Sequence, residues 1–234
     1  QEMINYYKQH YLPNNMSISI VGDVQDAFTQ VKEHFTFKPA SLPDKPSLVE
    51  QEDNKPKIIT EKRKMEDSYM ILGYKVPPRS NKTSYSIDII RAILGGGMSS
   101  KLFDEIRIKR GLSYGVSAEH DSNTTFGTFS VTLNAHKDKM KLIQDIILKE
   151  IKNLKDIDDK SLEEAKTYLE GNYLIDNESN QSRASSLNYW SMVGSAKLAD
   201  DYIKNIKEVS KQDIVKAAST YLNANYTFAI LQQS

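Results

Sequence analysis

The fold is decided by the stretch LGGGMSSKLFDEIRIKRGLSY, residues 94–114. Apolar residues recur at helical spacing through residues 84–94, which predicts a helix that the three following glycines end. Ser99 or Ser100 stands where a side chain caps the next helix, which we expect to run to about Lys109. Two helices joined by a glycine turn, with a strand directly behind them, are typical of a protein that mixes α and β structure.

Strands are predicted on both sides of that stretch. In residues 126–135, apolar Phe129, Val131 and Leu133 alternate with serine and threonine, so one face of this strand is expected to be buried. The predicted strands are residues 16–21, 57–62, 68–76, 112–120, 126–135 and 226–231. The other predicted helices cover residues 2–11, 28–35 and the apolar stripe of 140–154, and two more open at a Ser161–Glu164 capping box and at Ser210. We therefore predict an α+β fold, an antiparallel-rich mixed sheet with helices packed on one face.

A weak internal repeat divides the chain. Residues 11–21 align with residues 221–231 at an offset of 210, with four of eleven positions identical, and each copy follows an amphipathic helix. Residues 39–56 hold four of the seven prolines, few aromatics and many charges, as interdomain linkers do. We therefore expect the C-terminal end of a preceding homologous domain at 1–38, a linker at 39–56 and a second domain at 57–234.

Composition excludes several classes of protein. The 31 basic and 31 acidic residues give a formal net charge of zero, which argues against a nucleic-acid binder. There are no cysteines, so disulfides, thiol catalysis and cysteine zinc sites are excluded. No apolar run reaches the length of a membrane span and no signal peptide is visible, so we expect a soluble protein of the cytoplasm or the bacterial periplasm. Because the chain begins with Gln1 rather than Met, we expect its natural start to have been removed.

Four segments, in this order and spacing, carry a resemblance to a known family: residues 11–23, 94–103, 107–114 and 178–194. They resemble the second, non-zinc domain of the M16 metallopeptidases, the pitrilysin and mitochondrial-processing-peptidase family. The resemblance covers nearly the whole chain. It implies two homologous α+β domains joined by a linker, which agrees with the internal repeat, and it implies that this chain is one half of a two-part enzyme.

The resembled enzymes bind zinc through a His-x-x-Glu-His motif, in which two imidazoles one helical turn apart grip the metal and the glutamate activates a water. The histidines of this chain, His10, His34, His120 and His136, belong to no such motif and to no reversed one. His120 and His136 could be neighbours across a strand pair, but we interpret them as ordinary surface histidines, since two ligands alone seldom hold zinc. The resemblance therefore implies no metal ligand and no cofactor in this chain, with zinc supplied by a partner domain or subunit that carries the motif.

Arg107 and Tyr114 are the candidate site residues. In the resembled family, an arginine and a tyrosine at this spacing in the second domain face the zinc across an enclosed chamber and hold the substrate carbonyl and the developing oxyanion. A guanidinium and a phenol suit that role because both donate hydrogen bonds to negative charge as it forms. Arg110 is the nearest rival for the arginine's place, but it stands only four residues from Tyr114.

The glycine run, Gly95, Gly96 and Gly97, is interpreted as a tight turn between helices. A mobile gate for substrate is the alternative that related non-catalytic subunits suggest. A phosphate-binding loop is excluded on two grounds: the glycines follow a helix rather than a strand, and Lys101 precedes Leu102 rather than a serine or threonine.

Together with the resemblance, these residues predict the substrate-binding, chamber-closing C-terminal half of an M16-type zinc endopeptidase. Its partners are a domain or subunit with the His-x-x-Glu-His motif and a peptide held in extended form. Alone, the chain is expected neither to bind catalytic zinc nor to cleave peptides. A catalytically inactive structural or assembly subunit of M16 type is the alternative, and a stand-alone peptide-binding protein is a third hypothesis.

Overall fold

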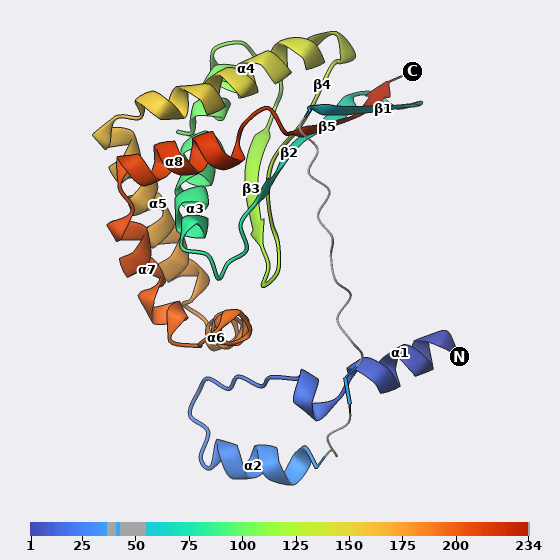
Figure 1. Cartoon of the computed structure of the whole chain (residues 1–234), viewed down its shortest axis with the longest axis vertical. Coiled ribbons are helices and arrows are strands. Elements are labelled where there is room, and N and C mark those ends of the chain that lie inside the picture. Colours follow the sequence, from blue (N-terminus) through green and yellow to red (C-terminus); the bar gives the residue numbers. More distant parts are fainter. Residues whose placement is uncertain (37–40, 43–54, 234) are drawn as a thin grey trace. The chain divides into compact units, whose positions relative to one another are not determined.

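The computed structural model of the chain describes residues 1–36, 41–42 and 55–233 (Figure 1). The predicted linker, residues 39–56, lies outside the described residues except at 41–42 and 55–56. None of the helices in the described part of the chain combines the length and the apolar character that a membrane span requires.

The chain divides into two compact units. The first unit is made of residues 1–52 and 174–200, and the second unit is made of residues 53–173 and 201–234. The chain passes between them within two helices, α5 (Asp159–Asp176) and α7 (Leu198–Glu208).

The second unit is built on a five-stranded sheet whose strand order is β1-β5-β2-β4-β3. Its strands are β1 (Lys57–Arg63), β2 (Ser68–Val76), β3 (Val116–Ser122), β4 (Gly127–Ala135) and β5 (Thr227–Gln233). The pair of β1 and β5 is parallel, and the other three pairs are antiparallel. The predicted antiparallel-rich mixed sheet is confirmed.

One face of the sheet is covered. Leu72 of β2 pairs with Val131 of β4 and Phe228 of β5, and Val131 pairs in turn with Ala118 of β3. All four side chains are buried, whereas the next residue along β2, Ile71, is 48% exposed. Because paired residues on neighbouring strands share a face, this row marks the side of the sheet that faces the core.

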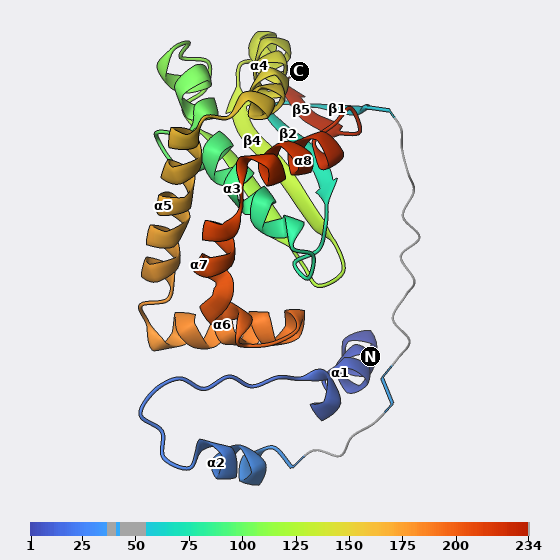
Figure 2. The same ribbon diagram turned by 60° about the vertical axis from the view of Figure 1, so that its left-hand side comes forward.

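Helices pack on that covered face, as Figure 2 shows. Those nearest the strands are α3 (Thr83–Gly95), α4 (Met140–Asn153) and α8 (Lys211–Tyr221). In both views α5 and α7 lie outside α3, further from the sheet. The apolar stripe predicted for the long helix is confirmed, since all of its members are buried: Met140, Ile143, Ile147, Ile151 and Leu154.

One predicted helix cap is confirmed and another is wrong. Ser210 and Asp213 form a reciprocal capping box at the start of α8. The predicted capping box of Ser161 and Glu164 is wrong, because the carboxylate of Asp158 accepts from the Ser161 N–H at 2.6 Å. Helix α5 thus begins at Asp159, and the residue before it provides the cap.

The first unit contains three helices in its described part, and one predicted strand is absent from it. The helices are α1 (Glu2–His10), α2 (Ala27–His34) and α6 (Asn180–Val193). Residues 16–21, predicted as a strand, form none, because residues 17–21 make no backbone hydrogen bond with another described residue. The segment is instead tied by a side chain, since the hydroxyl of Ser17 donates to the Asn188 side chain of α6.

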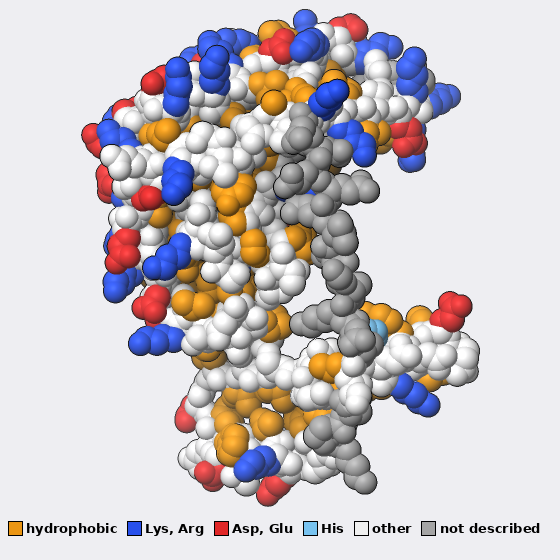
Figure 3. All heavy atoms as spheres, viewed as in Figure 1, with side chains coloured by type: hydrophobic (Ala, Val, Ile, Leu, Met, Phe, Trp, Pro, Cys, Tyr) orange, Lys and Arg blue, Asp and Glu red, His pale blue; other side chains and the backbone are white. Residues whose placement is uncertain are grey.

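The first unit also exposes many apolar side chains, which appear in orange in Figure 3. Exposed apolar residues of this unit include Met3, Ile4, Tyr6, Tyr7, Tyr11, Met16, Ile18, Ile20 and Phe28. Several of them lie on α1 and on the segment predicted as a strand. The unit therefore lacks, among its described residues, the surface that would cover them.

Gly95 allows α3 and β3 to lie close together. A Cβ atom at Gly95 would lie 2.3 Å from the backbone nitrogen of Ala118 and 2.5 Å from its Cβ atom. Real Cβ atoms do not approach backbone so closely, so a larger residue would push the helix away from the strand. The glycine that ends α3 is thus also a packing residue.

We predict that Gly95→Ala lowers the free energy of unfolding by about 2 kcal/mol or more, through overpacking against a backbone that cannot yield. Gly171→Ala is the matched control, because Gly171 lies in α5 with no heavy atom within 4 Å of its would-be Cβ. That change should leave stability equal or raise it by up to about 1 kcal/mol. Urea denaturation of the three proteins measures both, and equal stability of Gly95→Ala and wild type would contradict the packing role.

Candidate functional site

The structure brings Arg107 and Tyr114 into direct contact. The central carbon of the Arg107 guanidinium lies 4.2 Å from the centre of the Tyr114 ring and 4.9 Å from the centre of the Phe103 ring. A cation this close to aromatic rings is attracted by their quadrupoles. We call Phe103, Arg107 and Tyr114 the aromatic clamp.

Arg107 lies in a π-helix, Phe103–Ile108, where the sequence predicted an α-helix. The backbone N–H of Lys109 donates to the carbonyl of Asp104, five residues earlier, at 2.9 Å. π-Helical turns are rare and are often found at functional sites. The local backbone therefore singles out this segment without reference to any side chain.

The predicted serine cap of this helix is wrong. The hydroxyl of Ser100 is buried without a hydrogen-bond partner in the described structure, and no side chain caps the π-helix. The backbone provides the entry instead, since the Ser100 N–H donates to the Gly97 carbonyl at 3.2 Å and the Asp104 N–H donates to the Ser100 carbonyl at 3.0 Å. The helix therefore opens with backbone hydrogen bonds and without a serine cap.

Gly111 closes the turn that follows the π-helix. Its backbone is left-handed, with φ of 57°, and its N–H donates to the Arg107 carbonyl at 3.0 Å. A residue with a Cβ atom would be strained in that conformation. The turn at Gly111 reverses the chain so that Tyr114 comes back to Arg107.

The other basic side chains of this segment are held by carboxylates. Glu105 accepts from Lys109 at 2.6 Å and also pairs with Arg110, and Asp104 lies 2.7 Å from Lys109. Hydrogen bonds from Lys109 and then from Arg110 hold the pKa of Glu105 below its ordinary value. The Arg107 guanidinium, by contrast, makes no hydrogen bond or ion pair with any described residue, so its in-plane N–H groups are available to a ligand.

Ser113 anchors the loop that carries Tyr114. Its buried hydroxyl lies 2.7 Å from the Asn134 carbonyl of β4. The side chain thus engages the neighbouring strand before the regular ladder starts, and β3 begins at Val116 rather than at residue 112 as predicted. Tyr114 is left 82% exposed.

The glycine run lies between α3 and the π-helix. Gly95 packs on Ala118 of β3, and Gly96 packs on the ring of Tyr168 of α5. The run is therefore a turn that is enclosed by two neighbouring elements of the second unit.

The two histidines that the sequence analysis treated alike are in different environments. His120 of β3 pairs with Phe129 of β4, whereas His136 follows the end of β4, so the two are not neighbours across the strand pair. The side chain of His120 has no exposed surface, which makes its interpretation as a surface histidine wrong, and His136 is exposed beside Asp138. Across the described residues no group of three His, Cys, Asp or Glu side chains could hold a metal ion, so these residues do not fit a zinc site.

His120 belongs to a buried charged cluster that the sequence analysis did not find. Asp88 of α3 accepts two hydrogen bonds from the guanidinium of Arg79, at 2.6 and 3.1 Å. Nδ1 of His120 lies 2.7 Å from the same carboxylate, and the Tyr202 hydroxyl of α7 donates to it at 3.2 Å. The only signal in the sequence is an aspartate within the apolar helix 84–94.

Charge balance explains the ionisation of this cluster. Burial alone would raise the pKa of Asp88, but the Arg79 charge and the hydrogen bond from His120 outweigh burial and hold that pKa far below its ordinary value. Burial and then the nearby Asp88 charge raise the pKa of Tyr202. The cluster is thus a fixed ion pair with a neutral phenol, and it joins α3, β3 and α7.

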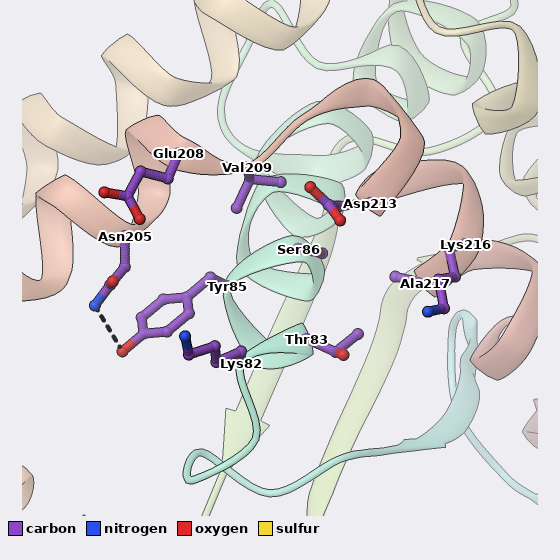
Figure 4. Close-up of a pocket in the computed structure, with 10 residues that line it drawn as sticks. All are labelled: Lys82, Thr83, Tyr85, Ser86, Asn205, Glu208, Val209, Asp213, Lys216 and Ala217. Atoms are coloured by element: carbon purple, nitrogen blue, oxygen red, sulfur yellow. Dashed lines mark hydrogen bonds between the residues drawn. The ribbon is translucent and has the colours of Figure 1, made fainter.

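A shallow pocket of about 240 Å³ lies between the start of α3 and the helices α7 and α8 (Figure 4). Its lining residues are Lys82, Thr83, Tyr85, Ser86, Asn205, Glu208, Val209, Asp213, Lys216 and Ala217. The amide of Asn205 donates to the Tyr85 hydroxyl at 3.2 Å, and Asp213 belongs to the α8 capping box. The first contact joins α7 to α3 and the second caps α8, and none of the predicted site residues lines the pocket.

The chain is similar to proteins of a known family. The family model described as the Peptidase M16 inactive domain matches residues 1–169. The uncharacterized zinc protease YmxG of Bacillus subtilis is 25% identical over 232 residues, which cover 98% of this chain and 56% of that protein.

Two solved structures share the fold. A protease from Helicobacter pylori matches with a TM-score of 0.89 at 21% identity, over 99% of this chain and 58% of that chain. A peptidase M16 inactive domain from Pseudomonas fluorescens matches with a TM-score of 0.68 at 23% identity, over 82% of this chain and 48% of that chain. The chain thus spans about half the length of the relatives that it matches.

We predict that Asp88→Asn lowers the free energy of unfolding at pH 7 by about 3–5 kcal/mol, because the Arg79 guanidinium is then buried without its counter-charge. Asp145→Asn is the control, since its pair with Lys141 is exposed, and it should cost less than about 1 kcal/mol. Denaturant titration measures both values. A loss of less than about 1 kcal/mol in both variants would contradict the stabilising role of the buried pair between Arg79 and Asp88.

We predict that the effect of Asp88→Asn on the free energy of unfolding depends on pH. A carboxyl whose pKa is lowered in the folded state contributes stability that is present above its unfolded pKa of about 3.9 and is lost as the pH falls below that value. The stability gap between wild type and Asp88→Asn should therefore be constant from about pH 5 to pH 6 and shrink below about pH 4. A gap that stayed constant down to about pH 2.5 would contradict the assignment of the low pKa to Asp88.

Proposed function

We propose, from the premise that this chain belongs to the M16 peptidase family as its inactive domain, that it is the substrate-binding, chamber-closing half of a zinc endopeptidase. The zinc-binding His-x-x-Glu-His motif lies in a partner M16 domain or subunit, and the substrate is a peptide. Arg107 and Tyr114 are the residues of this chain that contact the reacting peptide bond.

The unpaired state of Arg107 is the observation that carries the proposal. Lys109 and Arg110 are both engaged by carboxylates, whereas the guanidinium of Arg107 contacts rings only. Stacking occupies the faces of a guanidinium and leaves the N–H groups at its edge free. Tyr114 is 82% exposed, and its ring lies against the same guanidinium.

The chemistry expected of these two side chains is electrostatic. Zinc bound in the partner domain supplies a polarised carbonyl and an activated water. Arg107 and the Tyr114 hydroxyl bind and orient the substrate carbonyl, and their hydrogen bonds strengthen as negative charge develops on its oxygen. Arg110 is not assigned this role, because its charge is already balanced by Glu105.

We assign Gly95, Gly96 and Gly97 to a fixed turn rather than to a gate. A gate would have to leave its neighbours, yet Gly95 is packed on the Ala118 backbone and Gly96 on the ring of Tyr168. The turn holds the start of the π-helix against β3, where Tyr114 also arrives. Its contribution to function is therefore positional.

The internal repeat supports the proposed division of the chain into the end of a preceding domain, a linker and a second domain. At the offset of 210, α1 corresponds to α8, and residues 16–21 correspond to the first part of β5. Strand β5 is central in its sheet, between β1 and β2. By this correspondence, residues 16–21 form a central strand once a preceding domain provides two neighbours.

Corresponding residues of the two copies differ in burial, which supports the same division of the chain. Ile214 and Phe228 are buried in the second copy, while their counterparts Ile4 and Ile18 are exposed. Exposure of apolar residues at positions that a homologous copy buries indicates a missing neighbour. The partner that bears the zinc motif is the natural candidate, because the chain spans about half the length of its relatives.

We predict that Arg107→Ala lowers kcat/KM for a quenched fluorescent peptide by about 100-fold or more, measured with this chain assembled with the half that bears the zinc motif. The chain alone should show no cleavage. Arg110→Ala is the matched control and should stay within about threefold of wild type, because Arg110 acts on Glu105 and not on substrate.

Unchanged cleavage by Arg107→Ala, with assembly shown by size-exclusion chromatography, would favour the alternative of a structural or assembly subunit. Measurable peptide affinity of the chain alone, without cleavage in any assembly, would favour the stand-alone binding protein.

We predict that Ile18→Asp weakens association with the half that bears the zinc motif by about tenfold or more, because a buried isoleucine contributes about 1.5–3 kcal/mol. Ser19→Asp is the control, since successive residues of a strand point to opposite faces and Ser19 corresponds to the outward Ala229. Titration calorimetry measures the affinity. Equal effects of the two changes would contradict the strand assignment.

A further inference from the structure

We propose that Phe103 is a positioning residue that holds the Arg107 guanidinium in place for the peptide bond. The inference rests on the proposed function, which assigns substrate contact to Arg107. Phe103 stands four residues before Arg107, a spacing at which side chains on a helix are neighbours. Its ring lies 4.9 Å from the guanidinium carbon.

Arg107 needs such a support because its guanidinium makes no hydrogen bond or ion pair with a described residue. An arginine side chain has many rotamers, and ordering it without a hydrogen bond or an ion pair is costly in entropy. Its described contacts are the rings of Phe103 and Tyr114. Tyr114 is 82% exposed and lies in a loop, so the ring carried on the same π-helix as Arg107 is the more rigid of the two supports.

The charges around the clamp keep this support intact. Two acidic residues, Asp104 and Glu105, lie beside Phe103 in the sequence and would attract Arg107 away from the rings. Both are engaged by other bases, Asp104 by Lys109 and Glu105 by Lys109 and Arg110. The aromatic contact therefore meets no competing carboxylate from this helix.

Contact with an aromatic ring suits a guanidinium that must still donate hydrogen bonds to a substrate. A carboxylate partner would hold Arg107 by the same N–H groups that the substrate carbonyl requires. An aromatic ring holds the cation without using those donors. Phe103 thus fixes the position of Arg107 while leaving its hydrogen-bonding capacity for the substrate.

The first test examines the contact itself in the 234-residue chain. Phe103→Leu keeps an apolar side chain and removes the ring, and Phe103→Tyr keeps the ring. By NMR, the order parameter of the Arg107 Nε–H group should fall in Phe103→Leu and be retained in Phe103→Tyr. The ring-current shift of the Arg107 methylene protons should decrease only in Phe103→Leu, where the Tyr114 ring remains. Ile108→Ala, at an exposed position of the same π-helix, controls for general loosening.

Equal Arg107 order in wild type and Phe103→Leu would overturn the inference. Equal loss of order in Ile108→Ala and Phe103→Leu would overturn it as well, because the effect would then belong to the helix and not to the ring. Thermal unfolding of each variant shows whether the fold is kept, and Phe103→Tyr supplies the comparison if Phe103→Leu is unstable.

The second test measures cleavage by the assembled enzyme. Phe103→Leu should lower kcat/KM by about three- to tenfold, the effect of one cation–π contact, with the loss mainly in kcat, and Phe103→Tyr should restore wild-type values. A large loss in Arg107→Ala with none in Phe103→Leu would overturn this inference and leave the proposed function standing. No loss in Arg107→Ala would overturn the proposed function, and the catalytic role of Phe103 with it.

Discussion

The buried ion pair between Arg79 and Asp88 is the interaction on which the second unit depends. Two charges removed from water must satisfy each other, because either one left alone is far less stable than an exposed charge. Asp88 lies within α3, and the same carboxylate is bound by His120 of β3 and by Tyr202 of α7. The pair therefore fixes where α3 lies on the sheet and joins a distant helix to it.

The candidate site is a consequence of that constraint. Helix α3 ends at Gly95 and strand β3 begins at Val116, so the connecting segment starts and finishes at elements that the ion pair has already fixed. The close approach of Gly95 to Ala118 shortens the distance between them. Within this span the chain must leave the helix and return to the strand. The π-helix and the left-handed Gly111 accomplish that return, and they bring together side chains from its two ends.

Much of the fold could be predicted from the sequence, because it follows from local patterns. The alternation in β2 and β4, the apolar stripe of α4 and the Ser210 cap are each contained in a few neighbouring residues. Two errors have causes outside such windows. Residues 16–21 have strand alternation, but no described strand lies beside them. His120 looked like a surface residue because its partner Asp88 is 32 residues away. The resemblance selected Arg107 and Tyr114 but not Phe103, although its spacing of four residues from Arg107 is one at which side chains on a helix meet.

Arginine has two opposite uses in this chain, and the contrast bears on function. The donors of Arg79 meet a carboxylate in a buried site, so that residue has a structural role. Arg107 contacts two aromatic rings, and its guanidinium makes no hydrogen bond or ion pair with any described residue. Ile18 is also without a partner among the described residues, since it is an exposed apolar side chain in a segment predicted as a strand. Under the proposed function, a peptide carbonyl would accept the hydrogen bonds that Arg107 can donate. A sheet of the partner domain that bears zinc would cover Ile18.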